Sequence, residues 1–140
     1  LHDRIDACAR AREIIEEDVR RAPENPDAAG ELAVVEMVEA DCLALLQNYD
    51  RSLAMHLRAR DQFERDIEKH PPNWSAVNLM LQNDVGTGIV QQAMGRNSEA
   101  ALTLQRARNE AEKWLERFPG NPAILYRLIQ AANRQRIVES

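Results

Sequence analysis

The sequence repeats itself every 48 residues without a gap, and this period constrains the fold more than any other feature. Identical residues recur in three successive copies at several positions. These positions are Pro23, Pro71 and Pro119; Asn25, Asn73 and Asn121; Glu16, Glu64 and Glu112; and the Arg-Ala-Arg tripeptides that begin at Arg10, Arg58 and Arg106. Periods of this length are typical of arrays in which each repeat is one supersecondary unit that packs on its neighbours.

Two kinds of junction divide each period. The first is a Pro/Asn cluster, and proline disfavours helix in the residue before it but suits the first turn of the next helix. Asn25 and Asn121 each precede a proline, so we expect both to be N-caps. The second junction lies in mid-period, where Gly95-Arg96-Asn97 predicts the end of one helix and the start of another.

Between these junctions the apolar residues follow helical spacing, as in Ile5, Cys8, Ile15 and Val19. No segment alternates with a period of two, so the sequence predicts an all-α protein without strands. The expected helices span residues 1–22, 26–47, 50–70, 74–95, 98–118 and 122–138. We expect a single domain, divided into a half-repeat 1–24, repeats 25–72 and 73–120, and a half-repeat 121–140. An array that starts and ends in mid-repeat suggests a fragment of a longer protein.

Composition limits the classes of partner. The net charge of −5 argues against broad binding to nucleic acid or to anionic membranes, which both need a positive field. No apolar run reaches the roughly 18 residues that a membrane-spanning helix requires, so we expect no membrane insertion. Cys8 and Cys42 match no redox or zinc spacing and are expected to be free thiols, which favours a cytoplasmic location.

The stretch Gly88-x6-Gly95-x4-Ala100-x3-Leu104-x2-Ala107 resembles the tetratricopeptide pattern, in which small residues let paired helices approach closely and a large residue fills the gap between hairpins. The usual period of that family is 34 residues, and the excess of 48 − 34 = 14 is about two extra turns on each helix. The sequence is similar to the long-helix tetratricopeptide arrays of bacterial signalling proteins. This resemblance implies antiparallel helical hairpins stacked as a short right-handed solenoid of about six helices.

No motif for catalysis, cofactor binding or metal binding is present, so we expect none of these sites. Gly86-Thr87-Gly88 lies within an expected helix and is interpreted as a place of close packing. His56 occupies the large-residue position and is expected to be half-buried. The repeated arginines and glutamates predict ion pairs four residues apart, such as Arg12 with Glu16, in each second helix.

In tetratricopeptide arrays the first helix of each hairpin lines a concave groove. Acids are the only charged residues in 26–47, Asp84 is the only one in 74–95, and arginines are the only ones in 122–138, so the groove is expected to run from acidic to basic. The resemblance implies groove positions with an apolar centre at Met37, Val85 and Ile89. The full set of expected groove residues is Met37, Asp41, Gln82, Val85, Ile89, Gln92, Asn133 and Arg134.

These observations favour a non-catalytic protein–protein interaction module, expected in a bacterial signalling or regulatory protein, that holds a peptide or a neighbouring domain in its groove. Two alternatives stay open. One is a self-association module, in which terminal helices of complementary charge form a homodimer. The other is an enzyme, which would need a clustered catalytic set.

Overall fold

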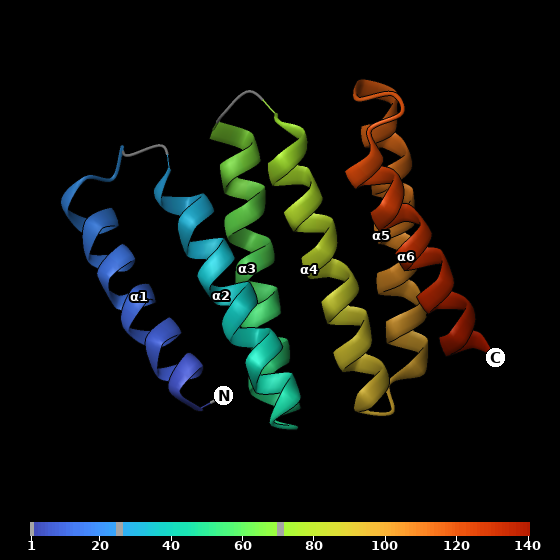
Figure 1. Ribbon diagram of the computed structural model, residues 1–140, viewed down its shortest axis with the longest axis horizontal. Helices are drawn as coiled ribbons and strands as arrows, with labels where there is room; N and C mark the ends of the chain where they lie inside the picture. The colour runs from blue at the N-terminus through green and yellow to red at the C-terminus, as the bar shows by residue number, and fades with distance from the viewer. Residues whose placement is uncertain (1, 25–26, 70–71) are drawn as a thin grey trace. The chain divides into compact units, whose positions relative to one another are not determined.

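The computed structural model describes residues 2–24, 27–69 and 72–140, and Figure 1 shows that all of its regular structure is helical. The all-α prediction is confirmed, because these residues form six helices and no strand. Each expected helix is found within two residues of its predicted ends. The helices are α1 (His2–Arg21), α2 (Ala28–Leu45), α3 (Tyr49–Lys69), α4 (Trp74–Ala93), α5 (Asn97–Arg117) and α6 (Pro122–Glu139).

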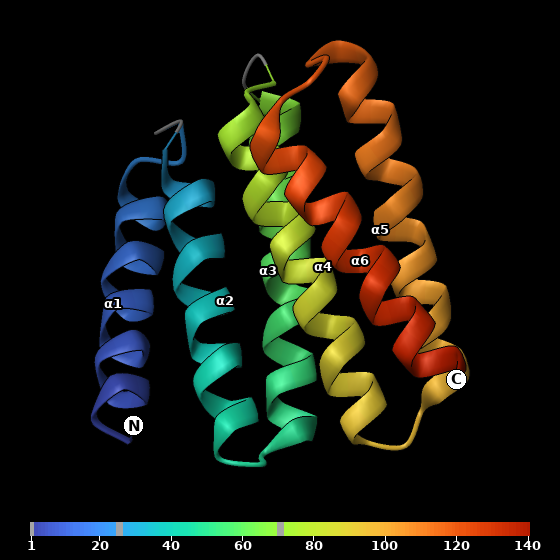
Figure 2. The same cartoon turned by 45° about the vertical axis from the view of Figure 1, so that its right-hand side comes forward.

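The helices gather into two compact units where we expected one domain. The first unit is Leu1–Pro72 and the second is Asn73–Ser140, so the division falls at a boundary between predicted repeats. In the first unit, α2 packs against both α1 and α3. In the second unit, α4, α5 and α6 each pack against the other two, as Figure 2 also shows. Short turns at residues 46–48 and 94–96 make α2–α3 and α4–α5 antiparallel hairpins.

Asparagine side chains cap the first helices of the second unit. The Asn121 carboxamide oxygen accepts hydrogen bonds from the backbone N–H groups of Ala123 (3.0 Å) and Ile124 (3.2 Å), and proline follows it at the first helical position. This confirms the predicted N-cap. Asn73, in the same repeat column, accepts from the N–H of Ala76 at 2.8 Å. Each such cap contributes about 1 kcal/mol to helix stability. The predicted cap at Asn25 lies outside the described residues.

Both hairpin turns use a residue in the left-handed region. Gly95 has a φ of +79° and donates its N–H to the carbonyl oxygen of Gln92 at 2.9 Å, which ends α4 as predicted. Gln47 occupies the same repeat column without being glycine. It has a φ of +61° and makes the equivalent hydrogen bond to Ala44 at 2.9 Å. The turn geometry is therefore a property of the repeat, and glycine serves it at one of the two turns.

Gly88 marks the closest approach of α4 to α5. A Cβ atom added at Gly88 would lie 2.8 Å from the Cγ and Cδ2 atoms of Leu104, a side chain with no exposed surface. Leu104 belongs to the core cluster of the second unit, together with Val85 and Ala131. The interpretation of Gly86-Thr87-Gly88 as a place of close packing is therefore confirmed at Gly88.

We predict that Gly88→Ala destabilises the second unit by about 1–2 kcal/mol, because the cost of overpacking exceeds the gain of about 1 kcal/mol in helix propensity. Urea unfolding followed by circular dichroism measures the change. Gly30→Ala is the matched control. Its added Cβ atom would meet the Asp66 carboxylate at 3.0 Å, the end of a side chain that can move aside. A Gly88→Ala protein as stable as its parent would contradict close backbone packing at this point.

Candidate functional site

The expected groove residues of the first unit lie in different environments. Met37 is 4% exposed and packs inside its unit, so it offers no surface to a partner. Asp41 is exposed, and its Oδ1 atom lies 3.7 Å from Nε2 of His56. His56 is 1% exposed, so it is more deeply buried than the half-buried position that we expected.

In the second unit, the expected groove residues also divide between core and surface. Val85 is 2% exposed, and Ile89 is half-buried against the cluster that Val85 forms with Leu104. The apolar centre expected at Met37 and Val85 therefore needs correction, since both side chains are buried within their own units. In α4 the reason is that the Val85 position faces the second helix of its own hairpin.

The remaining members of the expected set lie nearer the surface of the second unit. Asn133 is exposed, whereas Gln82, Gln92 and Arg134 are half-buried. Two of these side chains carry a buried polar atom that has no hydrogen-bond partner, namely Oε1 of Gln92 and Nε of Arg134. Gln82 is the member of the set that contacts a charged group, the guanidinium of Arg127.

Arg127 joins α4 to α6 through amide side chains. Its Nε atom donates to Oδ1 of Asn78 at 2.9 Å, and its Nη2 atom donates to Oε1 of Gln82 at 3.1 Å, both on α4. Its Nη1 atom donates to Oε1 of Gln130, one turn further along α6, at 3.0 Å. Three amide oxygens from two helices thus hold one half-buried guanidinium in place.

The recorded hydrogen bonds of Arg127 all go to neutral acceptors, so its positive charge is oriented but not compensated by them. Burial lowers the pKa of Arg127, although a guanidinium stays charged at neutral pH. The ring of Tyr126 lies 5.0 Å from its Cζ atom and adds a cation–π contact. A guanidinium has five N–H donors, so those that remain can accept a carboxylate in a charge-assisted pair.

Sequence analysis placed Gln82 in this region but assigned no role to Arg127. One signal was present, because Gln82 and Gln130 stand 48 residues apart and repeat an amide at the same position of successive first helices. The missing information was the packing of α6 on α4, which brings Arg127 to both amides.

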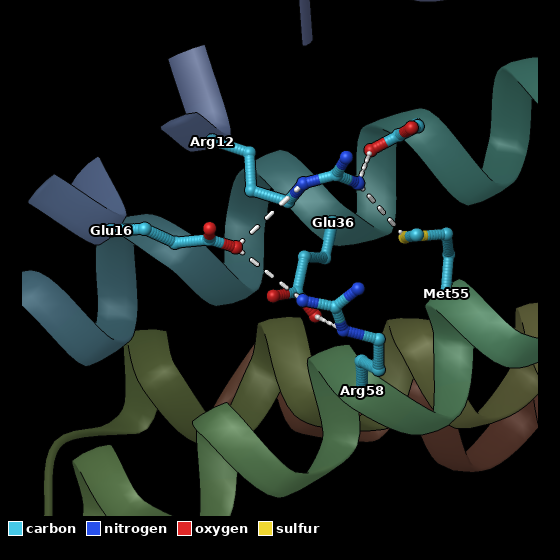
Figure 3. A network of polar contacts seen from close by, with 6 residues as sticks. Arg12, Glu16, Glu36, Met55 and Arg58 are labelled. Atoms are coloured by element: carbon cyan, nitrogen blue, oxygen red, sulfur yellow. Dashed lines mark hydrogen bonds and ion pairs between the residues drawn. The ribbon is translucent and has the colours of Figure 1, made fainter. Parts of the chain in front are cut away.

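The first unit contains a second polar cluster, drawn in Figure 3, which links its three helices. Arg12 on α1 donates from Nη1 to Oε2 of Glu39 on α2 at 2.6 Å and contacts Sδ of Met55 at 3.4 Å. Glu16 lies between two guanidiniums, with its Oε1 atom 3.8 Å from Nε of Arg12 and 3.4 Å from Nη2 of Arg58 on α3.

Glu36 lies at the buried end of this cluster. Its side chain is fully buried, its nearest recorded cation is Nε of Arg58 at 3.8 Å, and neither carboxylate oxygen has a hydrogen-bond partner. Burial raises the pKa of Glu36 to about 7, although Arg58 and Arg12 oppose the shift. Glu36 and Glu39 were expected to make the groove acidic, but both are internal, so that expectation is corrected for these two residues.

The repeated arginines serve the scaffold. The predicted ion pairs four residues apart are found between Arg12 and Glu16 at 3.8 Å and between Arg60 and Glu64 at 2.7 Å. In the third copy, Arg108 donates to Oε1 of Gln135 at 2.9 Å. Arg12–Glu39 and Arg108–Gln135 occupy the same two repeat columns, each 27 residues apart, so one contact recurs where a second helix meets the next first helix.

Comparisons with protein-family models, with curated proteins and with solved structures found no match to this chain. Within residues 2–24, 27–69 and 72–140, no helix has the length and apolar character needed to cross a bilayer. The same residues contain no group of three or more His, Cys, Asp or Glu side chains arranged to hold a metal ion.

We predict that Glu36 makes the first unit less stable as the pH rises. Its folded-state pKa of about 7 exceeds its ordinary value of 4.5, so its contribution is fully present below pH 4.5 and is lost as the pH rises through 7. The loss is at most about 3 kcal/mol, from roughly 1.4 kcal/mol per pKa unit. Glu36→Gln removes this titration, so its free energy of unfolding should fall less than the parent's between pH 5 and pH 8.

Urea unfolding at the two pH values measures this difference. Glu64→Gln is the control, because Glu64 is half-exposed and pairs with Arg60 on the surface of α3. Parallel pH profiles for the parent and Glu36→Gln would show that the buried carboxyl does not titrate in this range.

Proposed function

We propose that this chain is a non-catalytic helical-repeat interaction module whose second unit binds an acidic segment of a protein partner at Arg127. The proposal includes the setting that the tetratricopeptide resemblance implies, the cytoplasmic region of a bacterial signalling or regulatory protein. The observation that carries it is the half-buried guanidinium of Arg127, held by the neutral amides of Asn78, Gln82 and Gln130. An oriented cation whose recorded acceptors are neutral favours an incoming carboxylate.

Arg134 extends this site along α6. It follows Arg127 by seven residues, which is two helical turns and about 10.5 Å, so the two side chains lie on the same side of the helix. The Nε atom of Arg134 is buried and has no hydrogen-bond partner. Two carboxylates about 10 Å apart would therefore meet both guanidiniums.

That distance specifies the kind of peptide. An extended chain advances about 3.3 Å per residue, so acidic side chains three residues apart are separated by about 10 Å. Tyr126 is 58% exposed beside Arg127 and offers an apolar contact to the same ligand. We therefore expect an extended segment of the type Asp-x-x-Asp to bind more tightly than its Asn-x-x-Asn counterpart.

Fluorescence polarisation with two labelled peptide libraries tests this expectation. One library fixes Asp-x-x-Asp in random flanks and the other fixes Asn-x-x-Asn. The acidic library should bind the whole chain and weaken with salt. Arg127→Gln should reduce its affinity about tenfold or more, which corresponds to the roughly 1.5–3 kcal/mol of a hydrogen bond to a charged group.

Arg106→Gln is the matched control, because Arg106 is exposed on α5 and lies outside the amide cluster. It should bind the acidic library as the parent does. Equal binding of the two libraries, or full binding by Arg127→Gln, would overturn the proposed site.

A further inference from the structure

Helix α6 exposes an apolar stripe on one side. Leu125, Tyr126, Ile129 and Ile137 are between 37% and 58% exposed. Their spacing of four and eight residues places them on one side of a helix, together with Asn133 and Arg136, which are also exposed. The opposite side of α6 holds its buried residues, including Ile124 and Ala131. The stripe therefore points away from the core of the second unit.

The repeat identifies what such a face normally contacts. Leu125, Ile129 and Asn133 stand 48 residues after Val77, Leu81 and Val85, which are 0%, 0% and 2% exposed on α4. On α4 this column of residues lies against the antiparallel helix α5, since Val85 clusters with Ala100, Leu104 and Ala107. Helix α6 thus presents to solvent the face that α4 covers with an antiparallel helix.

We propose that the stripe on α6 pairs with the same stripe of a second copy of this chain, antiparallel and around a two-fold axis. Residues of one copy then face those of the other about a centre at Ala131. Leu125 lies opposite Ile137 of the second copy, and Ile129 lies opposite its Asn133. Each pairing occurs twice, as a two-fold axis requires. This interaction goes beyond the peptide site, which uses another side of α6.

The charges on the stripe fit this arrangement. Arg136 of one copy lies opposite Tyr126 of the other, where a guanidinium can contact the aromatic ring. The two Arg136 residues stand ten helical residues apart along the axis, or about 15 Å, which exceeds the Debye length of about 8 Å at physiological salt. The pairing therefore brings no like charges together.

A head-to-tail contact between α6 and α1 of a second copy is the rival arrangement. It would continue the hairpin pattern, in which Oγ of Ser52 donates to the carbonyl oxygen of Ala40 at 2.7 Å. The corresponding columns of α6 and α1 hold Arg136 and Arg4. Two arginines would replace two small residues at the closest point of the helices, with both a steric and an electrostatic cost. The two-fold pairing avoids this cost.

The size of the contact predicts a weak dimer. Helix α6 has 18 residues and is about 27 Å long. A contact between two such helices lies near the lower limit of about 1,000 Å² for a specific association. We therefore expect the average mass of the chain to rise with concentration over roughly 10 µM to 1 mM, and to level off at two chains.

Sedimentation equilibrium over that range tests the proposal. Ile129→Glu should abolish the rise in mass, and Ile129→Arg should do the same, because each places like charges near the axis. An equimolar mixture of the two variants should restore the dimer, since position 129 of one copy lies about 6 Å along the axis from position 129 of the other. This rescue distinguishes self-pairing of one face from every head-to-tail contact.

Leu102→Glu is the matched control, because Leu102 is 69% exposed on α5 in the same unit and should leave the dimer unchanged. Circular dichroism and binding of the acidic peptide check that each variant is folded. A strict monomer at every concentration overturns the proposal, as does a mass that grows beyond two chains or a mixture that fails to rescue. None of these outcomes bears on the Arg127 site, which the peptide libraries test separately.

Discussion

The close packing of the first helix of a hairpin against the second is the constraint on which the rest of this structure depends. At Gly88 the backbone of α4 approaches Leu104 so closely that a methyl group has no room. The equivalent point of the first hairpin holds Ala40, whose carbonyl oxygen accepts a hydrogen bond from Ser52. Helices that approach to this distance must keep one face small and apolar, which explains why the repeat survives in these columns.

Sequence reasoning succeeded where a local rule determines the structure. Proline and asparagine fix where α6 begins, and the left-handed turn at Gly95 fixes where α4 ends. It was wrong about the apolar centre of the groove. The positions of Met37 and Val85 were carried over from an array with shorter helices, and in α4 that column turns toward the partner helix. Charge counts were also incomplete as a guide, because Glu36 shows its charge in the sequence but not its burial.

The two units use their charged side chains differently. In the first unit, Arg12 and Arg58 face the carboxylates of Glu16, Glu36 and Glu39, so most of the charge is balanced within the fold. Removing one partner from such a cluster leaves a buried charge, which ties these residues to stability. In the second unit, Arg127 has neutral acceptors, and its orientation leaves electrostatic free energy to be gained from an outside anion.

The departures of α6 from the repeat separate scaffold from interaction surface. Leu125 and Ile129 keep the apolar character of the α4 residues that pack on α5, so this face still gains free energy when another helix covers it. Asn133 and Arg136 replace Val85 and Gly88, and the bulk of Arg136 prevents the approach that Gly88 allows. A helix that covers α6 must therefore lie further away than α5 lies from α4 and must offer an aromatic or polar group to Arg136. An antiparallel copy of α6 meets both conditions, because Tyr126 stands opposite Arg136.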